Sequence, residues 1–306
     1  MRPLRGIIFK LLSVTLFIMM SALIKYISDE VPPGQAVFFR SFFAIPVILV
    51  WLILRRDLKR GLRVTSVFGH VRRGVSGTMA MGLGFAGLAY LPLPEVTALG
   101  YAAPLLTVIF AALILGEKVR LFRISTVLLG LAGVLVVLSP RLGFGDSPND
   151  AAAAFGAMLV LGGAVFAALA QIATRALVST ESTSAIVFCF SVTASVISLA
   201  SLPFGWVVPE PATAAILVLI GLIGGFGQIL LTSSYREADA SLVAPFDYAS
   251  ILFALAIGYW VFDEVPTVTM LAGAALVILA GVLIIWREHR LGLERARQRK
   301  AMTPQG

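Results

Sequence analysis

Residues 116–138 read GEKVRLFRISTVLLGLAGVLVVL, and residues 263–286 read DEVPTVTMLAGAALVILAGVLIIW. The last eight residues of each stretch, LAGVLVVL and LAGVLIIW, are nearly the same. The likeness extends backwards, because Tyr101 lies sixteen residues before Glu117 and Tyr248 lies sixteen residues before Glu264. A fainter likeness links residues 37–39 (VFF) with 187–189 (VFC). A repeat whose period is about half of the chain indicates an internal duplication rather than a solenoid.

The composition places this duplication in a membrane. Of the 306 residues, 59% are hydrophobic and 13% are charged, and long uncharged stretches recur throughout. Such a composition departs from that of soluble globular domains and is typical of an integral membrane protein. The single cysteine, Cys189, rules out a disulfide framework. The formal net charge of +8 does not indicate nucleic-acid binding, because the basic residues cluster between apolar stretches without recognition motifs.

Ten apolar stretches have about the length that a helix needs to cross a bilayer. None of them alternates polar and apolar residues as a barrel strand does, so we expect an all-α fold of ten transmembrane helices. The predicted spans cover residues 7–27, 34–54, 70–90, 94–115, 121–139, 152–173, 183–203, 212–233, 240–262 and 267–286.

The distribution of lysine and arginine predicts the orientation. With the N-terminus in the cytoplasm, nearly all basic loop residues fall on the inner side, and Arg141 alone falls on the outer side. This asymmetry satisfies the positive-inside rule and predicts a multi-pass inner-membrane protein with both termini cytoplasmic. The predicted organisation is a first five-helix repeat (1–140), an outer linker (141–152), a second five-helix repeat (153–287) and a basic cytoplasmic tail (288–306).

The parity of the spans suggests a mechanism. Because each half holds five spans, an odd number, the second half enters the membrane in the opposite sense to the first. Two inverted repeats that exchange conformations are the usual basis of alternating access, with the substrate held near the midplane where the halves meet. The sequence therefore predicts a transporter.

These features resemble the EamA family of the drug/metabolite transporter superfamily. The resemblance rests on the five-plus-five duplication and on a glutamate, Glu117 or Glu264, that closes the fourth span of each half before a glycine-rich fifth span. It implies a secondary-active carrier of a small polar organic metabolite, amino-acid-like or zwitterionic, such as an amino acid or S-adenosylmethionine. A flat aromatic metabolite such as riboflavin, or a drug, is the alternative cargo. It also implies that the third, fourth, eighth and ninth spans line the pathway.

Polar side chains inside predicted spans are the candidates for substrate binding, because such groups are costly in hydrocarbon. Arg40 presents a planar fork that suits a carboxylate, or it pairs structurally with Glu95 or Asp29. Asp247 follows Pro245, which opens a helix, and it is either a proton carrier and amine site or the partner of a basic residue near the inner surface. The basic residues considered for that pair are Arg236 and Arg175.

Five further residues complete the predicted site. Tyr101 and Tyr248 either stack on a ligand or pack within the bundle. Gln171 and Gln228 either contact substrate or hydrogen-bond between helices. Met79 either offers a soft surface to a ligand or only packs.

The expected partners are a small-molecule substrate, membrane lipids and, as a coupling ion, protons, with the chain acting as a monomer or a homodimer. No residue pattern calls for a cofactor or a metal, nucleic acid is not an expected partner, and no catalytic constellation suggests an enzyme. The competing interpretation is a non-transporting protein that handles lipids or serves as a structural component of a membrane complex.

Overall fold

The computed structural model describes residues 3–115, 121–141, 148–178, 180–237 and 244–302. Within these residues every element is a helix, as predicted. Glu117, the repeat partner of Glu264, lies outside the described residues. The helices of the first half are α1 (Pro3–Tyr26), α2 (Pro33–Phe42), α3 (Ala44–Leu54), α4 (Leu58–Gly61), α5 (Val67–Leu88), α6 (Leu93–Gly100), α7 (Ala102–Leu115), α8 (Leu121–Leu138) and the 3-10 turn η1 (Ser139–Arg141).

The second half repeats this order with fewer interruptions. Its helices are α9 (Pro148–Val178), α10 (Thr183–Leu199), α11 (Pro211–Glu237), the 3-10 turn η2 (Ala244–Tyr248), α13 (Ala249–Phe262) and α14 (Val268–Met302).

Three of the predicted spans are broken helices. The span 34–54 consists of α2 and α3, interrupted at Phe43, and the span 94–115 consists of α6 and α7, interrupted at Tyr101. Each interruption lies three residues before a proline, Pro46 or Pro104, whose ring excludes the carbonyl of the preceding turn. The span 240–262 begins with η2 and continues as α13.

The helices are long and apolar enough for a multi-pass membrane protein. Five continuous stretches reach the length and hydropathy of a membrane span, namely Leu4–Tyr26, Pro33–Leu54, Leu93–Leu113, Ala151–Thr174 and Pro211–Leu231. Four shorter apolar helices accompany them, namely Ile124–Leu138, Thr183–Leu199, Phe246–Phe262 and Val268–Ile284. The one predicted span not among these nine is 70–90, which corresponds to α5 and carries two arginines near its start, so the number ten stays a prediction.

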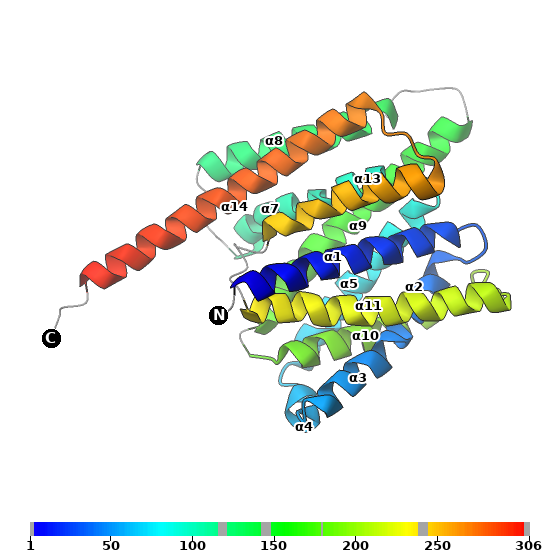
Figure 1. Ribbon diagram of the computed structural model, residues 1–306, viewed down its shortest axis with the longest axis horizontal. Coiled ribbons are helices and arrows are strands. Elements are labelled where there is room, and N and C mark those ends of the chain that lie inside the picture. The colour runs from blue at the N-terminus through cyan, green and yellow to red at the C-terminus, as the bar shows by residue number, and fades with distance from the viewer. Residues whose placement is uncertain (1–2, 116–120, 142–147, 179, 238–243, 303–306) are drawn as a thin grey trace.

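The packing of the helices has the pattern of a two-fold axis. The third span of each half packs along the first span of the other half, as α5 with α9 and α11 with α1. The second, fourth and fifth spans each pack against their own repeat partners, and Figure 1 shows the last of these pairs, α8 and α14, side by side. Duplicated halves meet in this way when equivalent elements exchange places across an axis.

The two halves run in opposite directions. Arg5 near the start of α1 lies 3.9 Å from Glu237 at the end of α11, and at the other end of α1 Lys25 lies 3.0 Å from Glu264, just before α14. We call these the Arg5 end and the Lys25 end of the bundle. The first helix, α1, starts at the Arg5 end, whereas its repeat partner α9 finishes there, where Glu181 contacts the segment before α5. The repeats are therefore inverted.

Glycines allow the closest approaches between these helices. At the crossing of α8 and α14, a Cβ added to Gly133 would lie 2.8 Å from the carbonyl oxygen of Gly273, and one added to Gly273 would lie 2.7 Å from that of Gly133. Lipid tails are as apolar as leucine, so association inside a membrane depends on such close packing rather than on a hydrophobic driving force.

We expect Gly133→Ala to lower the stability of the protein by about 1–3 kcal/mol, because the new methyl group meets backbone atoms that cannot rotate away. Gly84→Ala is the control, since nothing lies within 4 Å of a Cβ at that position. Thermal unfolding of the detergent-purified protein measures both. Equal melting temperatures for the two variants would contradict the assigned packing of α8 against α14.

Candidate functional site

An ion pair between a buried lysine and a partly exposed aspartate joins the two halves at the start of the ninth span. The ammonium of Lys10 lies 2.8 Å from Oδ1 of Asp247, and the side chain of Lys10 is only 1% exposed. Lys10 belongs to α1 and Asp247 to η2, so the pair links the first span of one half with the fourth span of the other. A buried charge requires such a partner, because an isolated one is costly in surroundings of low polarity.

The two repeat-related tyrosines complete this cluster. The rings of Tyr101 and Tyr248 stack with their centroids 4.7 Å apart and their planes inclined by 28°. The hydroxyl of Tyr101 donates a hydrogen bond to the backbone carbonyl of Asp247 and also contacts the hydroxyl of Ser250. Tyr101 occupies the interruption between α6 and α7, opposite the η2 turn, so both fourth spans are irregular where they meet. We call these residues, with Lys10, the Asp247 cluster.

The structure gives Asp247 a basic partner that the sequence analysis does not name. The predicted structural alternative pairs Asp247 with Arg236 or Arg175, whose side chains lie outside the description, whereas the observed partner is Lys10. Lys10 is not among the residues that the sequence singles out, although it falls inside the predicted span 7–27. A charge within a span is itself the signal that identifies such a residue.

A second group of charges lies deeper in the bundle. Arg40 of α2 is 4% exposed, and its guanidinium lies 5.6 Å from the ring centroid of Phe190 in α10. Arg73 of α5 lies 4.4 Å from the same centroid. The predicted structural pairing of Arg40 with Glu95 or Asp29 is wrong, because no described carboxylate forms a salt bridge with Arg40. The structure surrounds Arg40 with an aromatic ring and a second arginine instead.

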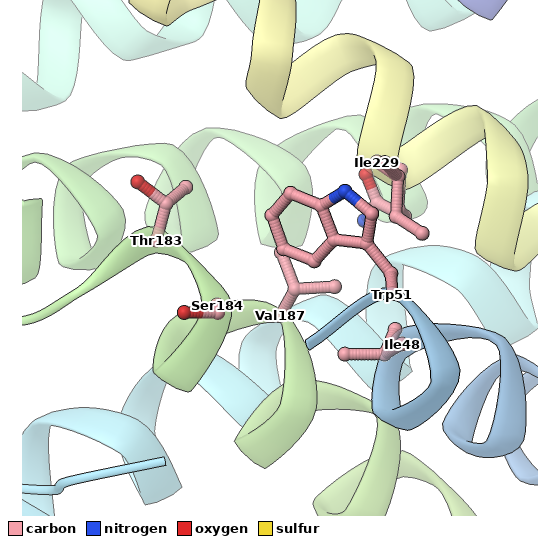
Figure 2. Close-up of a pocket in the computed structure, with 7 residues that line it drawn as sticks. Ile48, Trp51, Thr183, Ser184, Val187 and Ile229 are labelled. Atoms are coloured by element: carbon pink, nitrogen blue, oxygen red, sulfur yellow. The ribbon is translucent and has the colours of Figure 1, made fainter. Parts of the chain in front are cut away.

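The remaining predicted site residues make no described contact with the charged groups of either cluster. Gln171 is exposed on α9 and accepts a 3.2 Å hydrogen bond from the hydroxyl of Thr107 in α7, which is an interhelical contact. Met79 is 40% exposed on α5. Gln228 lines a small crevice between α3, α10 and α11, where Trp51 lies next to Ile229 (Figure 2). The structure therefore brings Asp247, Tyr101 and Tyr248 into contact, whereas no described hydrogen bond, ion pair or ring contact joins them to Arg40, Gln171, Gln228 or Met79.

At the Lys25 end, the contacts of Lys25 and Glu264 join α1 to two of the connections between helices. Besides its ion pair with Oε1 of Glu264, the ammonium of Lys25 donates hydrogen bonds to the carbonyls of Leu91 (2.7 Å) and Leu88 (3.3 Å). Oε2 of Glu264 accepts a 2.9 Å hydrogen bond from the backbone N–H of Leu93, at the start of α6. These contacts, which we call the Lys25 latch, hold α1, the α5–α6 connection and the α13–α14 connection to one another.

At the Arg5 end, the carboxylate of Glu181 joins the α9–α10 connection to the segment before α5. Oε1 of Glu181, between α9 and α10, accepts hydrogen bonds from the backbone N–H groups of Thr65 (2.7 Å) and Ser66 (2.6 Å) and lies 3.6 Å from Nε2 of His70. Burial opposes ionisation of this carboxyl, but the two amides and His70 outweigh it and hold the pKa of Glu181 below its usual range. The charge also complements the N-terminus of α5. Both ends of the bundle are thus closed by a glutamate that binds backbone of the opposite half.

Inverted helical halves with ionic groups buried between them define a class of protein, the multi-pass membrane carriers. The sequence matches the model of the EamA-like transporter family over residues 4–139 and again over residues 154–286. The chain therefore belongs to this family, as its sequence predicts, and it is a transporter rather than an enzyme.

Named relatives cover nearly the whole chain. The pseudopaline exporter CntI of Pseudomonas aeruginosa is 30% identical over 284 residues, which is 91% of this chain and 95% of the relative. The S-adenosylmethionine uptake transporter of Rickettsia prowazekii is 28% identical over 287 residues, 94% of each chain. A solved structure, titled only as the crystal structure of a protein, shares the fold with a TM-score of 0.63 and 22% identity over 95% of this chain and 99% of that one.

The Lys25 latch yields a prediction about stability. Lys25→Met leaves Glu264 without its cation in a largely buried setting, so we expect a loss of about 2 kcal/mol or more. The double variant Lys25→Met/Glu264→Gln removes both charges and should recover most of that loss. Thermal unfolding in detergent provides the measurement.

Arg5→Met is the matched control for Lys25→Met. It removes the cation of the 3.9 Å pair with Glu237, whose arginine side chain is 53% exposed, so we expect a change of no more than about 1 kcal/mol. If Lys25→Met were as mild as Arg5→Met, the latch would contribute nothing measurable to stability.

Proposed function

We propose that the protein is a secondary-active carrier of a small polar organic metabolite with an amino group and a carboxylate, such as an amino acid or S-adenosylmethionine. The observation that carries the proposal is the Asp247 cluster, in which the ion pair of the buried Lys10 with the partly exposed Asp247 and two stacked aromatic rings lie where the irregular fourth spans of both halves meet. A substrate amine competes with Lys10 for the carboxylate of Asp247, and the tyrosine rings offer flat faces to an organic cation.

Two relatives, one named for uptake and one for export, support this substrate class. One is named for the uptake of S-adenosylmethionine and the other for the export of pseudopaline, so both handle small organic metabolites. Their opposite directions show that the fold itself does not determine the direction of transport. The energy source we infer is a gradient of the substrate or of protons, and protonation of Asp247 is the step by which a proton would release Lys10.

The mechanism we propose is alternating access between two repeats, residues 1–140 and 153–287, that rock about their shared axis. Opening at the Lys25 end requires separation of the Lys25 latch, and opening at the Arg5 end requires release of Glu181 from Thr65 and Ser66. We infer from the distribution of basic residues, by the positive-inside rule, that the Arg5 end and both termini face the cytoplasm at the inner membrane.

The direct test is transport by the purified protein in proteoliposomes. We expect saturable uptake or counterflow of radiolabelled S-adenosylmethionine or of an amino acid such as methionine, and at least a tenfold loss, on the order of 1.4 kcal/mol or more, in Asp247→Asn. Measurements with and without an imposed pH gradient identify the coupling ion. Transport that is as fast in Asp247→Asn as in the wild type would overturn the proposed role of the Asp247 cluster.

Asp263→Asn provides the control for Asp247→Asn. Asp263 is exposed and lies in the left-handed region at φ 54°, a conformation that asparagine also adopts. The same chemical change at this position should leave transport unchanged. A loss in both variants would point to a general effect on the protein, and no transport of any amino acid or of S-adenosylmethionine by the wild type would refute the proposed substrate class.

A further inference from the structure

Two arginines in the middle of the bundle have donors without acceptors. Nε and Nη1 of Arg40 and Nη1 of Arg73 are buried and make no hydrogen bond to the protein. Nε of Arg73 donates a 2.6 Å hydrogen bond to the hydroxyl of Thr174, which is the one polar contact of either guanidinium that the description contains. Neither arginine forms a salt bridge with a carboxylate in the described part of the chain.

This arrangement is costly without a counterion. A guanidinium keeps its charge in proteins, and two of them over one phenylalanine ring repel each other while they lack water. Elsewhere in the bundle buried charges are paired, as the Asp247 cluster and the Lys25 latch show. An anion between the two guanidiniums would neutralise this repulsion and supply acceptors for the unused N–H groups, in the forked geometry that a carboxylate fits.

The duplication indicates that the fold itself does not need Arg40. Residues 37–40 (VFFR) align with residues 187–190 (VFCF), so Arg40 and Phe190 occupy equivalent positions, and they meet near the axis between the halves. The architecture therefore accepts an aromatic ring at this position. The first half carries a charge where the second half carries an apolar group, and a charge that the packing does not require points to a ligand.

Two glycines at equivalent positions of the two halves make room for the ring of Phe190 and the side chain of Arg40. Gly77 and Gly224 have the same separation in the sequence as Tyr101 and Tyr248. A Cβ at Gly77 would lie 2.7 Å from the ring of Phe190, and one at Gly224 would lie 3.1 Å from Nε of Arg40. The glycines let the arginine and the ring enter the interior of the bundle, where a polar ligand would be shielded from solvent.

The crevice in Figure 2 lies on the Arg5 side of Arg40, because α3 continues from α2 toward that end. Its lining residues Ile48, Val187 and Gln228 follow Arg40 by eight residues, precede Phe190 by three and follow Gly224 by four. The spacings of Val187 from Phe190 and of Gln228 from Gly224 place each of these two lining residues on the same helix face as its counterpart. Three or four residues correspond to about one turn of helix, so the crevice begins about one turn from the residues that contact the arginines.

We propose that Arg40 and Arg73, whose guanidiniums both lie over the ring of Phe190 in α10, bind the carboxylate of the transported substrate. We also propose that the crevice beside Trp51 and Gln228 is the route of the substrate from the Arg5 end. The inference rests on the proposed transport of an amino-acid-like metabolite and assigns one of its functional groups to a second subsite. The two arginines receive the acid.

The test compares ligands that differ only in the carboxylate. Proteoliposomes are assayed for transport of methionine against methioninamide, and of S-adenosylmethionine against its decarboxylated form. We expect the wild type to prefer the carboxylate member of a transported pair by at least about tenfold, as charge-assisted hydrogen bonds allow. Arg40→Met and Arg73→Met should reduce this preference to about twofold or less, and Arg40→Lys should retain part of it.

Arg72→Met is the matched control, because Arg72 is the neighbour of Arg73 on α5 but is exposed. It should keep the full preference. The melting temperatures of Arg40→Met and Arg73→Met should equal or exceed that of the wild type, since each removes an unpaired buried charge.

The outcomes separate this inference from the proposed function. Transport with the same carboxylate preference in the wild type, Arg40→Met and Arg73→Met would overturn the subsite but leave the carrier function intact, and so would transport without any preference. A large drop in melting temperature in both methionine variants would show that the arginines are structural and would also overturn the subsite. Transport of no member of either pair would refute the proposed function and, with it, the subsite.

Discussion

The cost of placing charge inside an apolar bundle governs this structure. An ionic group in hydrocarbon must find a partner, and two ion pairs among the described residues meet this requirement. Lys10 with Asp247 and Lys25 with Glu264 form ion pairs between halves, so each pair also fixes how the halves meet. Arg40 is the exception, because in the described part of the chain its guanidinium lies beside an aromatic ring and another cation and forms no salt bridge. Unpaired charge is where a polar ligand gains most by binding.

The duplication explains why these groups gather where they do. Two inverted halves related by a two-fold axis bring equivalent residues together at that axis. Tyr101 stacks on its own repeat partner Tyr248, and Arg40 lies over its repeat partner Phe190. The first contact keeps the symmetry and the second breaks it. A carrier needs both, because symmetry gives it two related states, whereas binding a single asymmetric molecule requires chemical differences between the halves.

The sequence predicts the fold better than the site, for a physical reason. The positions of the helices follow from apolar length and from the repeat, which are properties of single segments. The contacts of Asp247 and Arg40 depend on which helices pack together, and the sequence shows no such neighbours. Lys10 and Arg73 could have been identified, because both lie within predicted spans, but each stands close enough to a span end to be counted with the loops. The contact of Phe190 with two arginines had no sequence signal beyond the faint alignment with Arg40.

Alternating access requires two states of similar free energy, so no set of contacts can hold one state too firmly. The Lys25 latch and the contacts of Glu181 close opposite ends of the bundle, and both use a glutamate against backbone N–H groups. Separating either one exposes a charge, which water at that end can solvate as the end opens. Arg40 is only 4% exposed and has no such access to water, and in the proposed mechanism the carboxylate of the substrate neutralises its charge. In this mechanism, a substrate that neutralises the arginines changes the free energy of the occluded interior. At either end of the bundle, opening only moves the charge of a glutamate from its backbone partners to water. This division of roles lets a small molecule control the motion without direct contact with either latch.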